Sequence, residues 1–250
     1  MQKGTVMRRD VLFALRAAII AASFLLAVGC ASVQVSTSAA THIKRVGVVS
    51  ILGDRFQGRY IGTTVFNNKF YEADVSAWHL DTDVAGYVIK KLRGANFIAG
   101  RLDISPHSAD EFYQQGHFNL GLNARLFHGL PALAAKQGYD TLVVVMRPFN
   151  SDYKAYVPGY GFGKASFFGL SYSDLFASFT LFVFDAKTGR QLAQADGMMT
   201  GNKADKDIEW KPSFAQYTAL QRSVIKQRIE DSLRAELDVA LPATHLISAN

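Results

Sequence analysis

The side chains best suited to chemistry in this sequence are its six histidines, but their spacing does not predict a site. None belongs to a His-Glu-x-x-His segment, and His117 and His128 are eleven residues apart, which is about three turns of a helix. No Gly-x-Ser-x-Gly segment presents a serine nucleophile. We therefore expect no metal site, no cofactor and a protein that is not an enzyme. The histidines are His42, His79, His107, His117, His128 and His245.

The glycine-rich stretch 159–164 (GYGFGK) has the composition of a phosphate-binding loop, but its spacing excludes that function. Such a loop needs a glycine five residues before the Gly-Lys pair, where this chain has Pro158. It also needs a serine or threonine after the lysine, where Ala165 stands. We therefore expect no nucleotide to bind here.

A weak candidate ligand site follows the first apolar segment, at Asp54, Arg55 and Arg59. Open α/β sheets often bind ligands at the edge where their strands end. The alternative interpretation is a solvated turn. If the site exists, it predicts a periplasmic small-ligand binder or a hydrolase.

The only cysteine, Cys30, follows a basic and then apolar leader. Arg8 and Arg9 precede the apolar residues 17–28, a run of twelve. A signal-peptide core has roughly 7–15 such residues, whereas a membrane span needs about 20. Residues 1–29 are therefore predicted to be a signal peptide, and Met7 is an alternative start.

The segment Leu26-Ala27-Val28-Gly29-Cys30 resembles the lipobox of bacterial lipoproteins, although Ala27 replaces the preferred leucine. The resemblance implies cleavage before Cys30 and acylation of its thiol, which anchors the protein to a membrane. Ala31, in place of aspartate, resembles the outer-membrane sorting pattern, with the protein facing the periplasm. The alternative is an ordinary secretory signal cut near Ala31. Arg8-Arg9 loosely resembles a twin-arginine signal, so both export routes stay open.

The charge of the chain gives no indication of a nucleic-acid partner. The formal net charge is +6, and half of it lies in residues 1–29, where four basic residues face Asp10 alone. The remainder of the chain carries +3 without a basic run. Residues 30–42 are small and polar after the cysteine, which is typical of a flexible tether.

The pattern after residue 43 predicts a single α/β domain over residues 43–241, followed by a short tail, 242–250. We expect a mixed central sheet with two β-hairpins, helices on its faces and a long C-terminal amphipathic helix. Asp81 is a candidate helix cap, and Pro131 is expected at the start of a second helical piece within 109–137. The expected strands are 45–52, 60–66, 69–78, 96–102, 141–146, 176–184 and 191–199, and the expected helices are 81–94, 109–137 and 214–241.

Two short patterns, LAAKQGYDTLVVV (133–145) and FDAKTGRQL (184–192), resemble one group of domains. The group comprises the penicillin-binding-protein-activator lipoproteins of the outer membrane and the periplasmic part of the curli secretion lipoprotein. The resemblance covers residues 43–241 at the level of element order. It implies an accessory module that docks on envelope proteins without catalysis.

The segment 153–176 holds eight aromatic residues, four glycines and three charged residues, and is expected to be a long loop. If its rings face outward, they form a surface for a partner protein. The candidates for this contact are Tyr160, Phe162, Phe167 and Phe168. In the alternative interpretation, the rings fold back over the sheet as a minor core. Insertion into lipid is a third.

Overall fold

A computed structural model describes residues 34–36, 42–114, 121–148, 159–167, 170–199 and 208–248 of the chain. The chain divides into two units, Met1–Ser32 and Val33–Asn250, and all described residues belong to the second. The strands are β1 (Arg45–Ile51), β2 (Arg55–Ile61), β3 (Lys69–Asp74), β4 (Ile98–Arg101), β5 (Tyr113–Gln114), β6 (Gly121–Leu122), β7 (Thr141–Met146), β8 (Tyr160–Phe167), β9 (Leu170–Asp185) and β10 (Gln191–Met199). The α-helices are α3 (Leu80–Gly94), α4 (Ala124–Lys136) and α5 (Ala219–Ala243), and the 3-10 helices are η1 (Val65–Asn67), η2 (Ser76–Trp78), η3 (Ala109–Phe112) and η5 (Phe214–Gln216).

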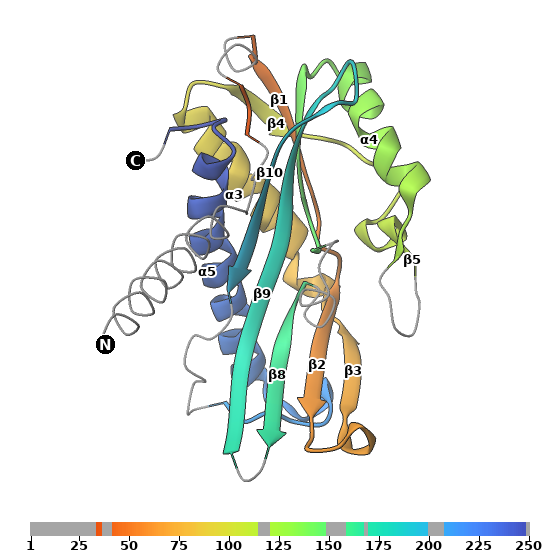
Figure 1. Ribbon diagram of the computed structural model, residues 1–250, viewed down its shortest axis with the longest axis vertical. Coiled ribbons are helices and arrows are strands. Elements are labelled where there is room, and N and C mark those ends of the chain that lie inside the picture. The colour runs from red at the N-terminus through yellow and green to blue at the C-terminus, as the bar shows by residue number, and fades with distance from the viewer. Residues whose placement is uncertain are drawn as a thin grey trace, which may run out of the picture. The chain divides into compact units, whose positions relative to one another are not determined.

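The main sheet is mixed and has eight strands (Figure 1). β1 pairs in parallel with both β4 and β7, and β7 pairs antiparallel with β9. All six residues of β7 are buried, because helices cover both faces of the sheet at this point. This explains why the apolar segment TLVVVM does not alternate with polar residues.

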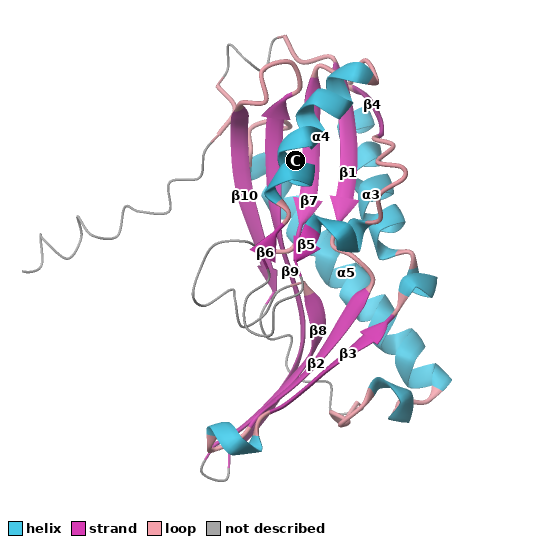
Figure 2. Ribbon diagram, turned by 90° about the vertical axis from the view of Figure 1, so that its right-hand side faces the viewer, coloured by secondary structure: helices cyan, strands magenta, loops and turns pink. Residues whose placement is uncertain are grey.

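The 16-residue strand β9 belongs to two parts of the sheet. Its first half pairs antiparallel with β8, which in turn pairs in parallel with β2. Its second half lies between β7 and β10. Figure 2 shows the resulting twist, with β2, β3 and β8 extending away from the strands that lie between the helices.

Two hydrophobic cores lie on opposite faces of the sheet, as the alternation of side chains along a strand requires. Val143 and Val145 of β7 face α3 and α5, whereas Val144 faces α4. Helices α3 and α5 run side by side, joined by an ion pair between Lys91 Nζ and Asp238 at 2.6 Å. The mixed α/β fold with a long C-terminal helix is therefore confirmed.

Several local expectations were wrong. Residue His79, not Asp81, stands at the N-cap of α3, and the side chain of Asp81 turns inward. The region 109–137 is interrupted by η3, β5 and β6, so Pro131 lies inside α4 and not at its start. Within 153–176, the expected loop is replaced by strand β8 and the first half of β9.

The described part of the expected tether, residues 34–36, is attached to the domain. The backbone N–H of Val35 donates to the carbonyl of Thr244 at 2.9 Å, just beyond α5. The Val35 side chain is 3% exposed and belongs to the same core as Leu246. The expectation of a flexible segment over residues 30–42 therefore needs correction at this point.

Candidate ligand-binding cleft

A cleft of about 540 Å³ opens where β1 and β4 end and α3 begins. This is the edge of the parallel strands at which α/β sheets commonly bind ligands. Its wall is polar, with hydroxyl, imidazole and carboxylate groups. The lining residues are Ser50, Asp54, Ser76, His79, Asp81, Thr82, Arg101, Leu102, Asp103, Ile104, Ser105, His107, Ser108 and Ala109.

Asp81 connects the floor of the cleft to the turn that follows β1. Its carboxylate accepts hydrogen bonds from the Ser50 hydroxyl and from the backbone N–H groups of Leu52 at 2.7 Å and Gly53 at 3.0 Å. Burial raises the pKa of Asp81, while these hydrogen bonds and the nearby Arg147 act in the opposite direction. The side chain therefore fixes the turn that carries Asp54.

The carbonyl groups of the same turn are also satisfied. Arg147, which is 4% exposed, donates from Nε to the carbonyl of Leu52 and from a terminal nitrogen to Asp110 at 3.0 Å. The Tyr160 hydroxyl donates to the carbonyl of Gly53 at 2.7 Å. A buried, hydrogen-bonded turn of this kind holds its side chains in one arrangement before any ligand arrives.

Asp54 is the carboxylate that this turn presents to the cleft. Partial burial raises its pKa, and the negative charges of Asp81, Asp110 and Asp74 raise it further. Its surroundings therefore disfavour the charged form. A cation placed beside Asp54 would relieve that repulsion.

Hydroxyl and imidazole groups of the described lining are hydrogen-bonded to carboxylates. His107 Nδ1 lies 2.8 Å from Glu111 Oε2, and the Ser108 hydroxyl donates to the other oxygen of Glu111. Ser50 donates to Asp81. No serine hydroxyl in the described lining is hydrogen-bonded to a histidine ring, which is the arrangement that activates a serine. Among the described residues, no group of three or more metal-ligating side chains is present.

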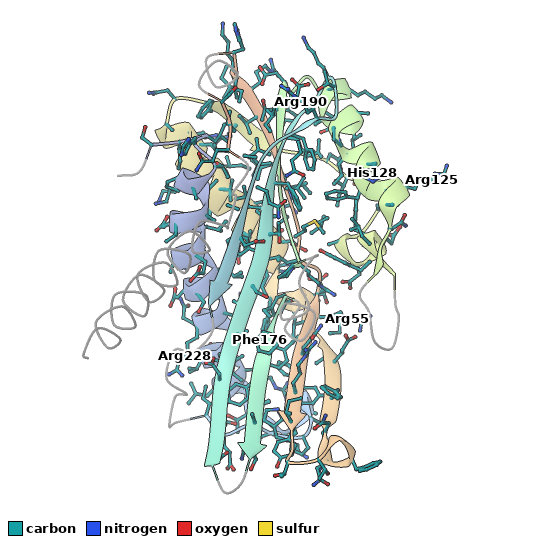
Figure 3. All side chains as sticks on the ribbon, in the orientation of Figure 1. Arg55, Arg125, His128, Phe176, Arg190 and Arg228 are labelled. Atoms are coloured by element: carbon teal, nitrogen blue, oxygen red, sulfur yellow. The ribbon has the colours of Figure 1, made fainter. Side chains whose placement is uncertain are left out.

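The structure brings only one of the three sequence-predicted ligand residues into the cleft. Asp54 lines it, but Arg55 and Arg59 do not. The Nε of Arg55 lies 3.6 Å from Asp110, and Figure 3 labels this residue at the start of β2. The guanidinium of Arg59 donates to the side chain of Gln57 at 2.7 and 3.1 Å, and burial lowers its pKa to about 10.

Two of the aromatic residues expected to contact a partner are buried. Tyr160 and Phe162 are each 1% exposed and belong to the core beneath α3 and α5. Their expected outward orientation is therefore wrong: the rings turn inward, and they join a main core of the domain and not a separate minor one. Phe168 and the side chain of Phe167 lie outside the described residues.

Sequence reasoning missed most of the lining, including His79, Thr82 and Asp103. Only their positions in the chain could have indicated them, because they lie at the start of the first long helix and just after the strand that follows it. Cys30 and the leader lie outside the described residues. Within the described part of the chain, no helix has the length and hydropathy needed to cross a bilayer.

Comparison with known proteins gives distant structural likenesses. No protein-family model and no curated protein matches the chain. Two PelC dodecamer structures from Paraburkholderia phytofirmans are similar at 8% and 10% identity, with TM-scores of 0.32 and 0.31. They cover 82% and 81% of this chain and 90% and 94% of the PelC chain. The hypothetical protein CT253 from Chlamydia trachomatis is 12% identical, covering 83% of this chain and 99% of its own, with a TM-score of 0.35.

Proposed function

We propose that the chain is a lipid-anchored protein of the bacterial envelope whose α/β domain binds a small cationic ligand without catalysis. The cleft beside Asp54 carries this proposal. Acylation of Cys30, which the lipobox pattern predicts, would anchor the domain to a membrane, and Ala31 predicts the outer membrane on its periplasmic side.

The charge of the cleft favours a cation over an anion. Asp54, Asp81 and Asp103 contribute carboxylates to the wall, and Arg101 is the one lysine or arginine in the described lining. A terminal nitrogen of Arg101 donates to the Thr82 hydroxyl at 3.0 Å. The hydroxyl groups of Ser50, Ser76 and Ser105 add hydrogen-bonding capacity for the ammonium or hydroxyl groups of a small polar molecule.

Titration calorimetry with a panel of small amines and uncharged sugars tests this function. We expect an amine to bind to the wild-type protein and its affinity to fall about tenfold or more in Asp54→Asn, because a partly buried charge pair between the ligand and Asp54 is lost. Asp83→Asn is the matched control, since Asp83 is exposed on α3, near the cleft but outside its lining. Equal affinity in Asp54→Asn and wild type would contradict the proposed site.

The affinity should also depend on pH through Asp54. As pH falls, protonation of Asp54 removes the negative charge that attracts the ligand. Because the pKa of Asp54 is raised above its usual 3.8, this loss begins at a higher pH than for an exposed aspartate. Tighter binding of the amine at acidic than at neutral pH would contradict the role proposed for Asp54.

The anchor is tested separately by metabolic labelling with palmitate. The wild-type protein is expected to take up the label and Cys30→Ser is not. The chain contains no second cysteine that could replace Cys30.

Docking on another envelope protein is a second candidate function, favoured by the tip of the β2–β3 hairpin. Phe66 is 92% exposed and Phe70 is 63% exposed. Large aromatic side chains in such positions often mark contact surfaces. A photocrosslinker at position 66 should give discrete adducts in intact cells, whereas one at Leu220, exposed on α5, should not.

A further inference from the structure

We infer that one end of the domain, where β1 and β4 begin, lies against an anionic phospholipid surface. This inference rests on the proposed acylation of Cys30. It adds to that proposal an interaction surface and an orientation, both of which follow from the position of Val35 and from the charges around it.

The first observation is the shortness of the connection between anchor and domain. Val35 is hydrogen-bonded to Thr244 and buried, so the chain joins the domain here and not at residue 43. Four residue steps separate Cys30 from Gln34, and such a chain spans at most about 14 Å when fully extended. An acylated Cys30 would therefore keep the end of α5 close to the lipid headgroups.

The second observation is that basic side chains gather at the same end. Strands β1, β4 and β7 begin here, the β9–β10 turn lies here, and α3, α4 and α5 end here (Figures 1 and 3, with Arg190 labelled). Among the described residues, those at the starts of β1, β4 and β7, in the β9–β10 turn and in the last six residues of α3, α4 and α5 include three acidic ones, Asp140, Asp185 and Asp238. Eight basic residues face them, for a net charge of +5: Lys44, Arg45, Lys90, Lys91, Arg93, Lys136, Lys187 and Arg190.

Helix ends account for only part of this charge. Lys90, Lys91, Arg93 and Lys136 lie near helix C-termini, where basic residues are favoured by the helix dipole. Lys44 and Arg45 precede and begin a strand, and Lys187 and Arg190 flank a β-turn, so no helix end explains them. All four are exposed. Basic residues close to an anionic membrane surface are attracted to it, and the attraction is strongest within a Debye length.

Exposed apolar side chains lie beside these charges. Ile98, the first residue of β4, is 65% exposed, and Val239, in the penultimate turn of α5, is 70% exposed. A surface that combines basic and apolar groups suits the headgroup region of a bilayer. The candidate cleft, at the opposite ends of β1 and β4, would then open away from the lipid.

Energy transfer from the acylated full-length protein in vesicles tests this orientation. Because Cys30 is the only cysteine and its thiol is acylated, a cysteine introduced elsewhere is the only free thiol for a donor dye. Lys187→Cys places the dye at the basic end and Phe66→Cys places it at the hairpin tip. The acceptor is a headgroup-labelled lipid, in vesicles of phosphatidylcholine with or without phosphatidylglycerol.

In vesicles with phosphatidylglycerol, we expect several-fold more transfer from position 187 than from position 66. Transfer from position 187 should fall several-fold when phosphatidylglycerol is omitted or when Lys136→Gln and Arg190→Gln are added. Lys69→Gln with Lys164→Gln, two charges on the part of the sheet that carries the hairpin tip, is the matched control and should change nothing.

Equal transfer from the two positions would overturn the inference. Transfer from position 187 that stays the same without phosphatidylglycerol and in the Lys136→Gln/Arg190→Gln variant would also overturn it. Co-flotation of the protein with the vesicles and palmitate labelling report the anchor itself. A protein that is not acylated therefore fails those two assays, whereas a protein anchored in another orientation passes them and fails only the transfer assay.

Discussion

Asp54 and Asp81 line the same cleft but have different roles. Asp81 is hydrogen-bonded to the turn after β1 and therefore supports its shape. Asp54 is carried by that turn, and its pKa is raised by burial and by neighbouring carboxylates. Removing Asp81 should therefore affect folding, whereas removing the charge of Asp54 should affect binding.

Asp81→Ala should lower the free energy of unfolding by about 2–4 kcal/mol, because the Ser50 hydroxyl and two backbone N–H groups lose their acceptor in a buried place. Urea denaturation followed by circular dichroism measures this. Asp83→Ala is the control, because Asp83 lies in the same first turn of α3 but is exposed. A similar loss of unfolding free energy in both variants would mean that Asp81 stabilises the protein through the helix dipole and not through its hydrogen bonds to the turn.

The sequence predicted Asp54 at this cleft because the position after a buried strand is a general property of α/β sheets. It did not predict that Asp81 turns inward, since an aspartate near a helix start is equally compatible with capping. The donors that Asp81 satisfies are 28 to 31 residues away in the chain. Arg59 was misplaced for a related reason, because strand β2 carries it away from the cleft.

At the scale of the elements, cross-strand pairs of glycine and aromatic residues shape the sheet. Gly161 of β8 lies opposite Phe176 of β9, Gly58 opposite Tyr71, and Gly197 opposite Phe179. In each pair, the nearest ring atom lies only 1.9–2.6 Å from the position that a β-carbon on the glycine would take. The glycines thus make room for aromatic rings against the sheet, and Phe176 is labelled in this position in Figure 3.

Gly161→Ala should destabilise the protein by about 1–3 kcal/mol, the usual range for an overfilled core. Its β-carbon would lie 2.0 Å from the backbone oxygen of Gln57 and 2.6 Å from the Phe176 ring. Gly163→Ala, two residues along the same strand, meets its nearest atoms at 3.8 and 3.9 Å and should be nearly neutral. Thermal unfolding of the two variants distinguishes them, and a neutral Gly161→Ala would contradict the tight packing described.

These pairs explain why some elements were predictable and others were not. β1, β7 and β10 have continuous apolar runs or follow clear turns, and both ends of each were predicted within one residue. The expected strand 176–184 corresponds to the second half of β9, which begins earlier, at Leu170. β8 was mistaken for a loop because its alternate glycines have low intrinsic strand preference. It pairs with β9, which begins three residues after β8 ends, and with β2, which lies far from it along the chain and is invisible to a local pattern.

At the scale of the whole molecule, basic side chains gather at the end of the domain where residues 34–36 are attached. The sequence shows no basic run, yet the fold collects eight basic residues from separate segments at the end where Val35 joins α5. The carboxylates of the cleft gather at the other ends of β1 and β4. Neither feature could be predicted without the topology, because each depends on which strand and helix ends coincide in space.

Val35→Ala should lower the free energy of unfolding by about 1–2 kcal/mol, since two buried methyl groups are removed from the core. Val239→Ala, at an exposed position of α5, should change it by less than about 0.5 kcal/mol. Chemical denaturation of the two variants makes the comparison. If Val35→Ala were as mild as Val239→Ala, the attachment of residues 34–36 to the domain would be too weak to orient it.

The hydrogen bond from Val35 to Thr244 has a mechanical consequence for an anchored protein. A force pulling on the N-terminus reaches this attachment at the end of α5 before it reaches β1, the strand next to the edge strand β4. Detachment of Val35 would lengthen the connection by the residues up to Ile43 while the sheet stays intact. If the protein is anchored as proposed, the domain would therefore yield to tension by releasing a short length of chain, without unfolding.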